Sequence, residues 1–266
     1  MKKKLLIIIP IAAAVIVAWL AFCGYQWSWG PFVKLHDFKT SALEGNGEKY
    51  SLDNAVPNAD SPIEGKTVLF LGSSVTYGSA SGGVSFADYI GKRDGCTVIK
   101  SAVSGTTLVE SGINSYVSRL KKLDAEKADL LVCQLSTNDA SQKKELGKII
   151  ESKNLNDFDT KTVAGAIEYI ICYSKEKWNC PVIFYTNPRY DSELYGEMVG
   201  ILKEAETKWG ISVIDMWNDA GLNAALNKNT ALYMADKIHP TKAGYLEIWT
   251  PFMEKTVFEV MKEEAK

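Results

Sequence analysis

Two short segments, far apart in the chain, carry the residue types that nucleophilic hydrolysis needs. The first, "VLFLGSSVTYG" (residues 68–78), is an apolar run that stops at a glycine and is followed by two serines. The second, "DKIHPTKAGY" (residues 236–245), holds one of the chain's two histidines, three residues after an aspartate. A serine is a weak nucleophile until a base takes its proton. The first segment therefore gains chemical meaning only together with the second.

Ser74 follows the apolar run, where its hydroxyl is expected at the edge of a sheet. Backbone N–H groups at the start of a loop or helix point outward there and favour a developing negative charge. The alternative is that Ser74 only caps the next helix, and capping serines are far commoner than catalytic ones. Taken alone, this segment favours a structural role.

Asp236 and His239 have a spacing that lets a carboxylate and an imidazole share one side of a turn. Pro240 suits the first turn of a following helix. Asp236 could then orient His239 and stabilise its cation, with His239 as the general base. The alternative is that Asp236 or Thr241 caps the helix while His239 lies on the surface.

Gly105 and Asn138 follow two further apolar runs and could donate hydrogen bonds to a developing oxyanion. A glycine N–H allows close approach, and an asparagine amide supplies a second donor. Each also has a structural alternative, a turn with positive φ for Gly105 and turn chemistry for Asn138. Four residue types that acyl-group hydrolysis requires thus occur together in one chain.

The elements that must position these residues alternate from Thr67 onward. Segments of helical period separate five apolar runs, "TVLFLG", "CTVIKSAV", "DLLVCQLS", "PVIFYTN" and "ISVIDMW". This alternation predicts a parallel sheet covered on both faces, and continuous apolar strands agree with burial of both faces. The predicted fold is a three-layer α/β/α sandwich with a five-stranded parallel sheet. In such sheets ligands bind outside the carboxyl ends of the strands.

Four segments together resemble the blocks of the SGNH hydrolases, the GDSL esterase/lipase family. They are "GSSVTYG" with Ser74, "SAVSGTTL" with Gly105, "STND" with Asn138, and "DKIHP" with Asp236 and His239. The resemblance extends over about residues 66–262. It has two departures, because Ser73 replaces the aspartate of the family name and Ser136 replaces a common glycine. Neither position is one of the four that carry catalysis.

The resemblance implies a flavodoxin-like sandwich and a serine hydrolase that needs no metal or cofactor. Ser74 would be the nucleophile, His239 the base and Asp236 its partner. The oxyanion hole would consist of the Ser74 and Gly105 N–H groups and the Asn138 side chain. The expected substrate is a carboxylic ester with a short acyl group, including O-acetyl esters of glycans. An O-acyltransferase acting on envelope glycans and a catalytically silent ligand-binding domain remain alternatives.

The loop "TNPRYDSELYG" after the fourth apolar run is a candidate wall of the substrate pocket. Arg189 and Tyr190 are the substrate-binding candidates within it. The alternative is an ordinary connection to the next helix, with Arg189 on the surface.

Residues 1–30 are predicted to form a signal anchor, a transmembrane helix at the N-terminus. Leu5 to Cys23 carry no charge, and their helical length nearly matches a hydrocarbon core. Lysines precede this run and a cluster of aromatic residues follows it, which predicts a single-pass protein with an extracytoplasmic body. A cleaved signal peptide, which would give a secreted protein, and a lipoprotein modified at Cys23 are the alternatives.

The remaining composition excludes several classes. The 266 residues carry a net charge of −2 without a basic patch, so a nucleic-acid partner is not expected. No CxxC pair occurs and the chain has two histidines, so a zinc site is not expected. Residues 31–65 are predicted to be a juxtamembrane linker that could include a short element packed on the body, and 66–266 the hydrolase domain. Cys172 and Cys180 are free thiols or a disulfide.

Overall fold

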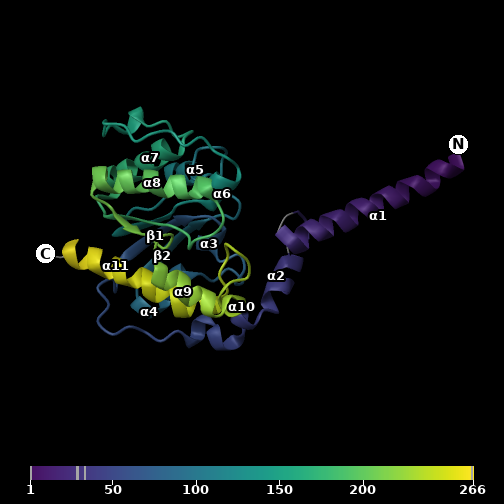
Figure 1. Ribbon diagram of the computed structural model, residues 1–266, viewed down its shortest axis with the longest axis horizontal. Coiled ribbons are helices and arrows are strands. Elements are labelled where there is room, and N and C mark those ends of the chain that lie inside the picture. Colours follow the sequence, from purple (N-terminus) through teal and green to yellow (C-terminus); the bar gives the residue numbers. More distant parts are fainter. Residues whose placement is uncertain (1, 28–29, 33, 265) are drawn as a thin grey trace.

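A central parallel sheet organises the molecule (Figure 1). The computed structural model describes residues 2–27, 30–32, 34–264 and 266, with side chains omitted for 2–9 and 27. The strands are β1 (Thr67–Gly72), β2 (Thr97–Ala102), β3 (Leu130–Gln134), β4 (Val182–Tyr185) and β5 (Ser212–Ile214). Their order is β2-β1-β3-β4-β5, and every neighbouring pair is parallel. This is the flavodoxin-like order, with its switch point between β1 and β3.

Helices cover both faces of the sheet, as Figure 1 shows. One face carries α5 (Tyr116–Lys122), α7 (Val163–Trp178) and α8 (Glu193–Trp209). The opposite face carries α4 (Phe86–Asp94), α9 (Ala220–Lys228) and α11 (Thr250–Glu264). The predicted three-layer α/β/α sandwich with a five-stranded parallel sheet is confirmed.

Alternation along the strands divides the core into two halves. On β1, Leu69 and Leu71 pack on the α7 side, whereas Val68 and Phe70 pack on the α4 side. All four side chains are fully buried. The continuous apolar strands noted in the sequence follow from this burial on both faces.

Several helix ends follow directly from local sequence. Ser85 caps α4 in a reciprocal capping box with Asp88. Ser192 caps α8 by accepting a hydrogen bond from the N–H of Tyr195, and α8 ends at Gly210, which has φ +58°. Gly210 therefore supplies the left-handed residue that ends α8.

The loops at the carboxyl ends of β1 and β3 contain short helices. They are α3 (Ser74–Tyr77) and α6 (Thr137–Ser141). Because β1 and β3 are adjacent, α3 and α6 begin side by side at the switch point, where ligands bind in open α/β sheets.

The segment between β5 and α11 contains elements that the sequence pattern did not predict. Two helices, α9 and α10 (Thr230–Tyr233), occupy residues that were not assigned an element. The predicted final helix begins with a wider π turn, Gly244–Trp249, before α11. Such a turn is rare and often marks a functional site.

The N-terminal region forms α1 (Lys2–Trp27) and α2 (Lys34–Ser41), and Figure 1 shows α1 extending away from the sheet. Within the described side chains, no helix is long and apolar enough to cross a membrane. The predicted anchor, residues 1–30, includes residues 1–9 and 27–29, which lie outside that description. A membrane span therefore stays a prediction.

Residues 31–65, predicted to be a linker, contain α2 and three 3₁₀ turns that pack on the body. The turns are Glu44–Asn46, Glu48–Tyr50 and Leu52–Asn54. Tyr50 and Ile63 are buried, and the hydroxyl of Tyr89 on α4 donates to the Tyr50 carbonyl at 2.6 Å. The described turns of this segment thus pack on the sandwich.

Candidate active site

The structure brings Ser74, His239 and Asp236 into one hydrogen-bonded row. Ser74 Oγ lies 2.8 Å from His239 Nε2. On the other side of the ring, His239 Nδ1 lies 2.8 Å from Asp236 Oδ2 and 3.0 Å from Oδ1. A carboxylate only accepts, so Nδ1 carries the proton and Nε2 is left to accept from the serine hydroxyl. This arrangement can deprotonate Ser74.

Gly72 and Ser73 shape the turn that presents Ser74. A Cβ added to Gly72 would lie 1.7 Å from Thr76 Oγ1, so only glycine fits at the end of β1. Ser73 immediately precedes α3, and its side chain is fully buried. Ser74 therefore begins α3 with its hydroxyl directed to His239.

The segment that carries His239 is fixed at several points. Asn187, which follows β4, donates from Nδ2 to the Ile238 carbonyl at 3.1 Å. The Tyr245 hydroxyl donates to the Val75 carbonyl of α3 at 2.6 Å. This second bond ties the start of the last helix directly to the turn of Ser74.

The Asp236 carboxylate contacts the backbone of the segment that carries His239 as well as the His239 ring. Its Oδ1 accepts from the N–H groups of Ile238 and His239 at 2.7 and 2.8 Å. Partial burial raises the pKa of Asp236, but the bonds from His239 and from these two N–H groups outweigh it and lower the pKa to about 2. Asp236 is consequently ionised at neutral pH and can stabilise a charged imidazole.

Gly105 and Asn138 lie at the same edge of the sheet as Ser74. Gly105 has φ +77°, and nothing lies within 4 Å of an added Cβ, so backbone conformation alone requires glycine there. Asn138 Nδ2 donates one hydrogen bond to the Thr106 carbonyl at 2.9 Å. A primary amide has two donors. The second donor has no partner among the described residues and Asn138 lines the cleft, so it could donate to a ligand there.

Asp139, the neighbour of Asn138, fastens the loop after β2. Its carboxylate accepts from the N–H groups of Leu108 and Val109 at 2.7 and 3.1 Å, and its side chain is fully buried. Burial raises the pKa of Asp139, although the Leu108 N–H, Ser136 and the Val109 N–H act in the opposite direction. Asp139 thereby sets the position of the Gly105 loop relative to Asn138.

Gln134, the last residue of β3, accepts four hydrogen bonds beneath the serine turn. Its Oε1 receives the Ser73 N–H at 2.9 Å, the Thr76 hydroxyl at 3.0 Å, and the Ser73 and Tyr116 hydroxyls at 3.3 Å each. The Thr76 hydroxyl also lies 2.6 Å from the Tyr185 hydroxyl. This buried cluster fixes the backbone immediately before Ser74.

Arg119 of α5 braces the strand ends from the other side. Its guanidinium donates to the Gly72 carbonyl at 2.6 Å and to the Ser101 carbonyl and hydroxyl. Burial lowers the pKa of Arg119. The guanidinium joins the carboxyl ends of β1 and β2 at the point where Ser74 follows.

A cleft of about 600 Å³ opens above these residues. It is lined by Gln26, His36, Ser74, Ser79, Ser104, Gly105, Thr137, Asn138, Ser141, Tyr190, Asp191, Ser192, Asp236, Lys237, Ile238 and His239. All five residues singled out from the family blocks line this one cleft. Of the two substrate-binding candidates, Tyr190 lines the cleft and Arg189 does not.

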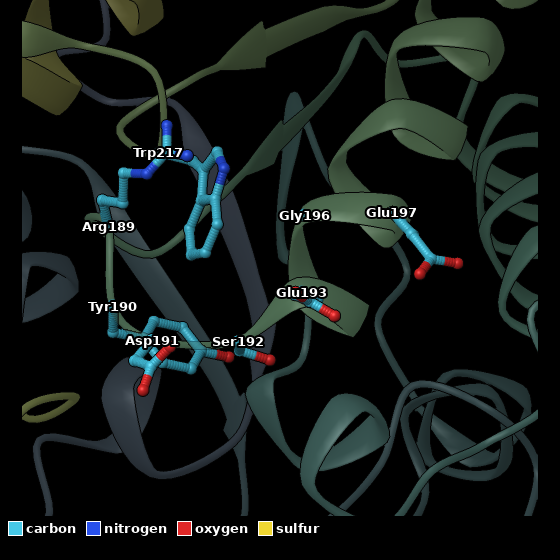
Figure 2. A pocket seen from close by; sticks show the side chains of 8 residues that line it. All are labelled: Arg189, Tyr190, Asp191, Ser192, Glu193, Gly196, Glu197 and Trp217. Carbon is cyan, nitrogen blue, oxygen red and sulfur yellow. The ribbon is translucent and has the colours of Figure 1, made fainter.

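Arg189 belongs to a neighbouring hollow of about 840 Å³, shown in Figure 2. Its guanidinium carbon lies 5.3 Å from the centre of the Trp217 ring, and its backbone N–H donates to Asn223 Oδ1 at 2.9 Å. Tyr190 borders both the hollow and the cleft. The two depressions therefore share one wall, and Arg189 lies on the far side of it.

The sequence of residues 70–246 matches the profile of the GDSL-like Lipase/Acylhydrolase family over more than half of the chain. This chain belongs to that family. No curated protein sequence matches it. Within the described residues, no group of histidine, cysteine, aspartate or glutamate side chains could hold a metal ion.

Solved structures share the fold of this GDSL-like chain at low sequence identity. A protein from Lactobacillus plantarum superimposes with a TM-score of 0.62 at 18% identity, over 73% of this chain and 97% of its own. A protein from Bacteroides ovatus described as a GDSL-like lipase gives 0.56 at 16% identity, over 74% and 99%. A second one, from Bacteroides uniformis, gives 0.55 at 17%, over 73% and 95%.

Both departures of this GDSL-like chain from its family blocks have structural explanations. Ser73, which replaces the aspartate, donates to Gln134 within the buried cluster. Ser136, which replaces the glycine, accepts the Asn138 N–H at 3.1 Å and caps α6. Each serine is fully buried and supports the residue that follows it, Ser74 or Thr137.

Sequence reasoning did not identify Gln134, Arg119, Gln26 or His36. Gln134 had a usable signal, since a glutamine that ends an otherwise apolar strand needs buried partners. Arg119 looked like an ordinary basic residue of an amphipathic helix. His36 and Gln26 lie in segments assigned to a linker and an anchor, and no local pattern places them beside Ser74.

Proposed function

We propose that this chain is a serine esterase that hydrolyses carboxylic esters through Ser74, His239 and Asp236. The observation that supports it is the continuous row of contacts of 2.8 Å from Ser74 Oγ through the His239 ring to Asp236. The alternatives of a capping serine and a surface histidine do not require this row. Family membership supports hydrolase chemistry, and the row suggests how it proceeds.

In the proposed reaction, Ser74 Oγ attacks the ester carbonyl carbon while its proton passes to His239 Nε2. The carbonyl oxygen becomes an oxyanion, which the N–H groups of Ser74 and Gly105 and the Asn138 amide stabilise. His239 then gives its proton to the departing alkoxide, so an alcohol leaves and an acyl-enzyme remains. Water, activated by His239, attacks the acyl group, and the acid is released with Ser74 reprotonated.

A short acyl group on a polar alcohol is the proposed substrate class, with O-acetyl esters of glycans as the leading example. Support comes from the lining of the cleft, where Tyr190 and Ile238 are the only large apolar side chains among the described residues. A long acyl chain would need an apolar trough, because burial of its methylenes provides its binding energy. Two such side chains give only a short apolar surface, which suits an acyl group of a few carbons.

Replacing the nucleophile tests the proposal. The parent chain should hydrolyse 4-nitrophenyl acetate and react covalently with a fluorophosphonate probe, and Ser74→Ala should do neither. Ser73→Ala is the matched control, because Ser73 is adjacent but faces the buried cluster. It should still be labelled. Labelling or turnover that persists in Ser74→Ala would refute the assignment, and a parent chain without either activity would favour a silent binding domain.

We further propose an extracytoplasmic, membrane-attached location, on the basis of the uncharged run from Leu5 to Cys23 behind its lysines. Fractionation of cells that express the full chain provides the test. The protein should stay with membranes after alkaline carbonate extraction and be accessible to protease from outside. Recovery in the soluble fraction would contradict it, and loss of residues before Cys23 would indicate one of the processed forms.

A further inference from the structure

The C-terminal end of α1 and helix α2, here called the N-terminal helix pair, form one wall of the cleft that contains Ser74. Gln26, near the end of α1, and His36, in α2, line the same cavity as Ser74, Asn138 and His239. Both residues lie outside residues 70–246, the part of the chain that matches the family. The helix pair thus contributes to the cleft from a part of the chain that the family match does not include.

Specific hydrogen bonds fix the position of α2 on the body. Asn46 Nδ2 donates to the Thr40 carbonyl of α2 and to the Ala80 carbonyl, at 2.7 Å each. Its Oδ1 accepts the Lys242 N–H at 2.8 Å. One buried amide therefore joins α2 to the loop after α3 and to the segment just after His239. The end of α2 cannot shift without breaking contacts on both sides of the cleft.

Gln26 and His36 have defined hydrogen-bonding roles. His36 Nδ1 lies 3.2 Å from the Tyr25 carbonyl, which can only accept, so Nδ1 carries the proton. The other ring nitrogen, Nε2, is then an acceptor in the neutral ring. Gln26 Oε1 accepts from Lys39 Nζ at 2.7 Å, which leaves the two Gln26 amide hydrogens as donors. The helix pair therefore offers one acceptor, His36 Nε2, and one donor group, the Gln26 amide.

A pair of groups that accepts and donates is complementary to vicinal hydroxyls, each of which does both. Lys237 lines the same cleft and adds a further donor. An apolar or anionic partner would use only part of this set. Sugar rings carry several hydroxyls, each of which can donate to an acceptor and accept from a donor.

We propose that Gln26 and His36 form a subsite that binds the hydroxyl-rich alcohol moiety of the ester. This inference rests on the proposed esterase function and deepens it, because it assigns the sugar side of the substrate to the N-terminal helix pair. The acyl group then lies toward Gly105 and Asn138. The subsite raises affinity for glycan esters without taking part in bond breaking.

The test compares two acetyl esters in the full chain. One is 4-nitrophenyl acetate, whose alcohol has no further hydroxyl, and the other is an acetylated cellobiose, followed by acetate release. For His36→Ala and for Gln26→Ala, the ratio of kcat/KM for the sugar ester to kcat/KM for the aryl ester should fall about fivefold to tenfold, through a higher KM. His36→Gln restores an acceptor near the place of Nε2 and should recover most of the ratio.

Phe38→Ala is the matched control, because Phe38 lies on α2, does not line the cleft and is 74% exposed. Its ratio should equal that of the parent. Circular dichroism of each variant establishes that α2 and the body are folded. An unchanged ratio in both His36→Ala and Gln26→Ala would overturn the subsite.

Different results show whether the subsite alone or the esterase function has failed. A parent chain that hydrolyses the aryl ester through Ser74 but does not act on the sugar ester would overturn the subsite and leave the esterase standing. An aryl-ester activity that survives in Ser74→Ala would overturn the esterase and the subsite together. A ratio that falls in His36→Ala and Gln26→Ala and recovers in His36→Gln supports both proposals.

Discussion

At the scale of single residues, the site depends on which nitrogen of His239 carries the proton. Asp236 decides this by accepting from Nδ1 and from two backbone N–H groups of the same turn. With a pKa of about 2, its carboxylate remains ionised wherever the protein is expected to work. The role of Asp236 is therefore to fix a tautomer and an orientation.

Asp236→Asn tests this role. The asparagine amide can donate to Nδ1, which would place the ring proton on Nε2 and block acceptance of the Ser74 proton. We expect kcat for 4-nitrophenyl acetate to fall by about 10²–10⁴-fold with little change in KM. Steady-state kinetics measures this, and binding of the uncharged ester should be retained. A loss below threefold would remove Asp236 from the proposed mechanism.

Single residues also show what sequence reasoning can and cannot find. Ser74, His239 and Asp236 were assigned to one site because family blocks identify each residue by its immediate neighbours, and the structure brings them together, while their catalytic roles stay predictions. His36 could not, because its significance arises only when Asn46 seats α2 beside Ala80, a contact between residues 34 positions apart. No local pattern encodes such a contact. The predicted role of Arg189 stays a prediction, although its position across the shared wall does not favour it.

At the scale of elements, the backbone that follows a strand needs a buried hydrogen-bond partner, in addition to the polar side chain that it presents to the site. Gln134 supplies it for β1, since its oxygen accepts the Ser73 N–H and three hydroxyls. A buried N–H without a partner is costly, so Gln134 holds the turn in place. The strand end before Ser74 is thereby positioned by the strand next to it.

Gln134→Met and Gln134→Glu form a matched pair. Methionine keeps the volume but removes the acceptor, so the turn shifts and kcat should fall about 10-fold to 100-fold with KM nearly unchanged. Glutamate keeps acceptor oxygens for the same four donors, and should retain most of kcat. Equal losses in both variants would contradict the positioning role. Fluorophosphonate labelling rates provide a second readout of Ser74.

Asp139 predicts a pH effect on stability. Its pKa is raised in the folded state, so its stabilising contribution is complete below the unfolded pKa, near 3.9, and is lost as pH rises through the folded pKa. The free energy of unfolding of the parent, minus that of Asp139→Asn, should therefore decrease as pH rises from about 4. Urea titrations at a series of pH values measure this difference. An increase with pH would contradict the prediction.

At the scale of the whole molecule, the fold was predictable because its signals repeat. Five apolar runs separated by helical segments led to the parallel sandwich, and burial of both faces makes that pattern strong. The helices α9 and α10 were missed because residues 218–235 have no comparable periodicity. Within residues 31–65 only a short packed element was expected, since its polar turns resemble a linker and few of its side chains are buried.

Phe86 of α4 tests the dependence of the molecule on its aromatic core. Its ring centre lies 5.1 Å from Tyr185, 5.7 Å from Phe70 and 6.1 Å from Trp249, and its side chain is fully buried. Phe86→Ala should lower the free energy of unfolding by about 3–5 kcal/mol. Urea unfolding followed by tryptophan fluorescence measures this change.

The control for Phe86→Ala is Ile113→Ala, which alters a side chain that is 76% exposed. Its effect should stay within about 0.5 kcal/mol. Because Phe86 does not line the cleft, kcat per molecule titrated with the fluorophosphonate should match the parent for both variants. A similar destabilisation by both substitutions would show that the aromatic core is not the main source of stability.

The contact between Ser74 and His239 also has a consequence for when the enzyme becomes active. The two residues are 165 positions apart, and every strand after β1 lies between or beside them. At about 5–20 residues per second, a ribosome needs roughly ten to thirty seconds to pass from one to the other. During that interval the serine is already made but has no base. The proposed nucleophile and its base therefore come together only after β5 and the segment that carries His239 have been added to the chain.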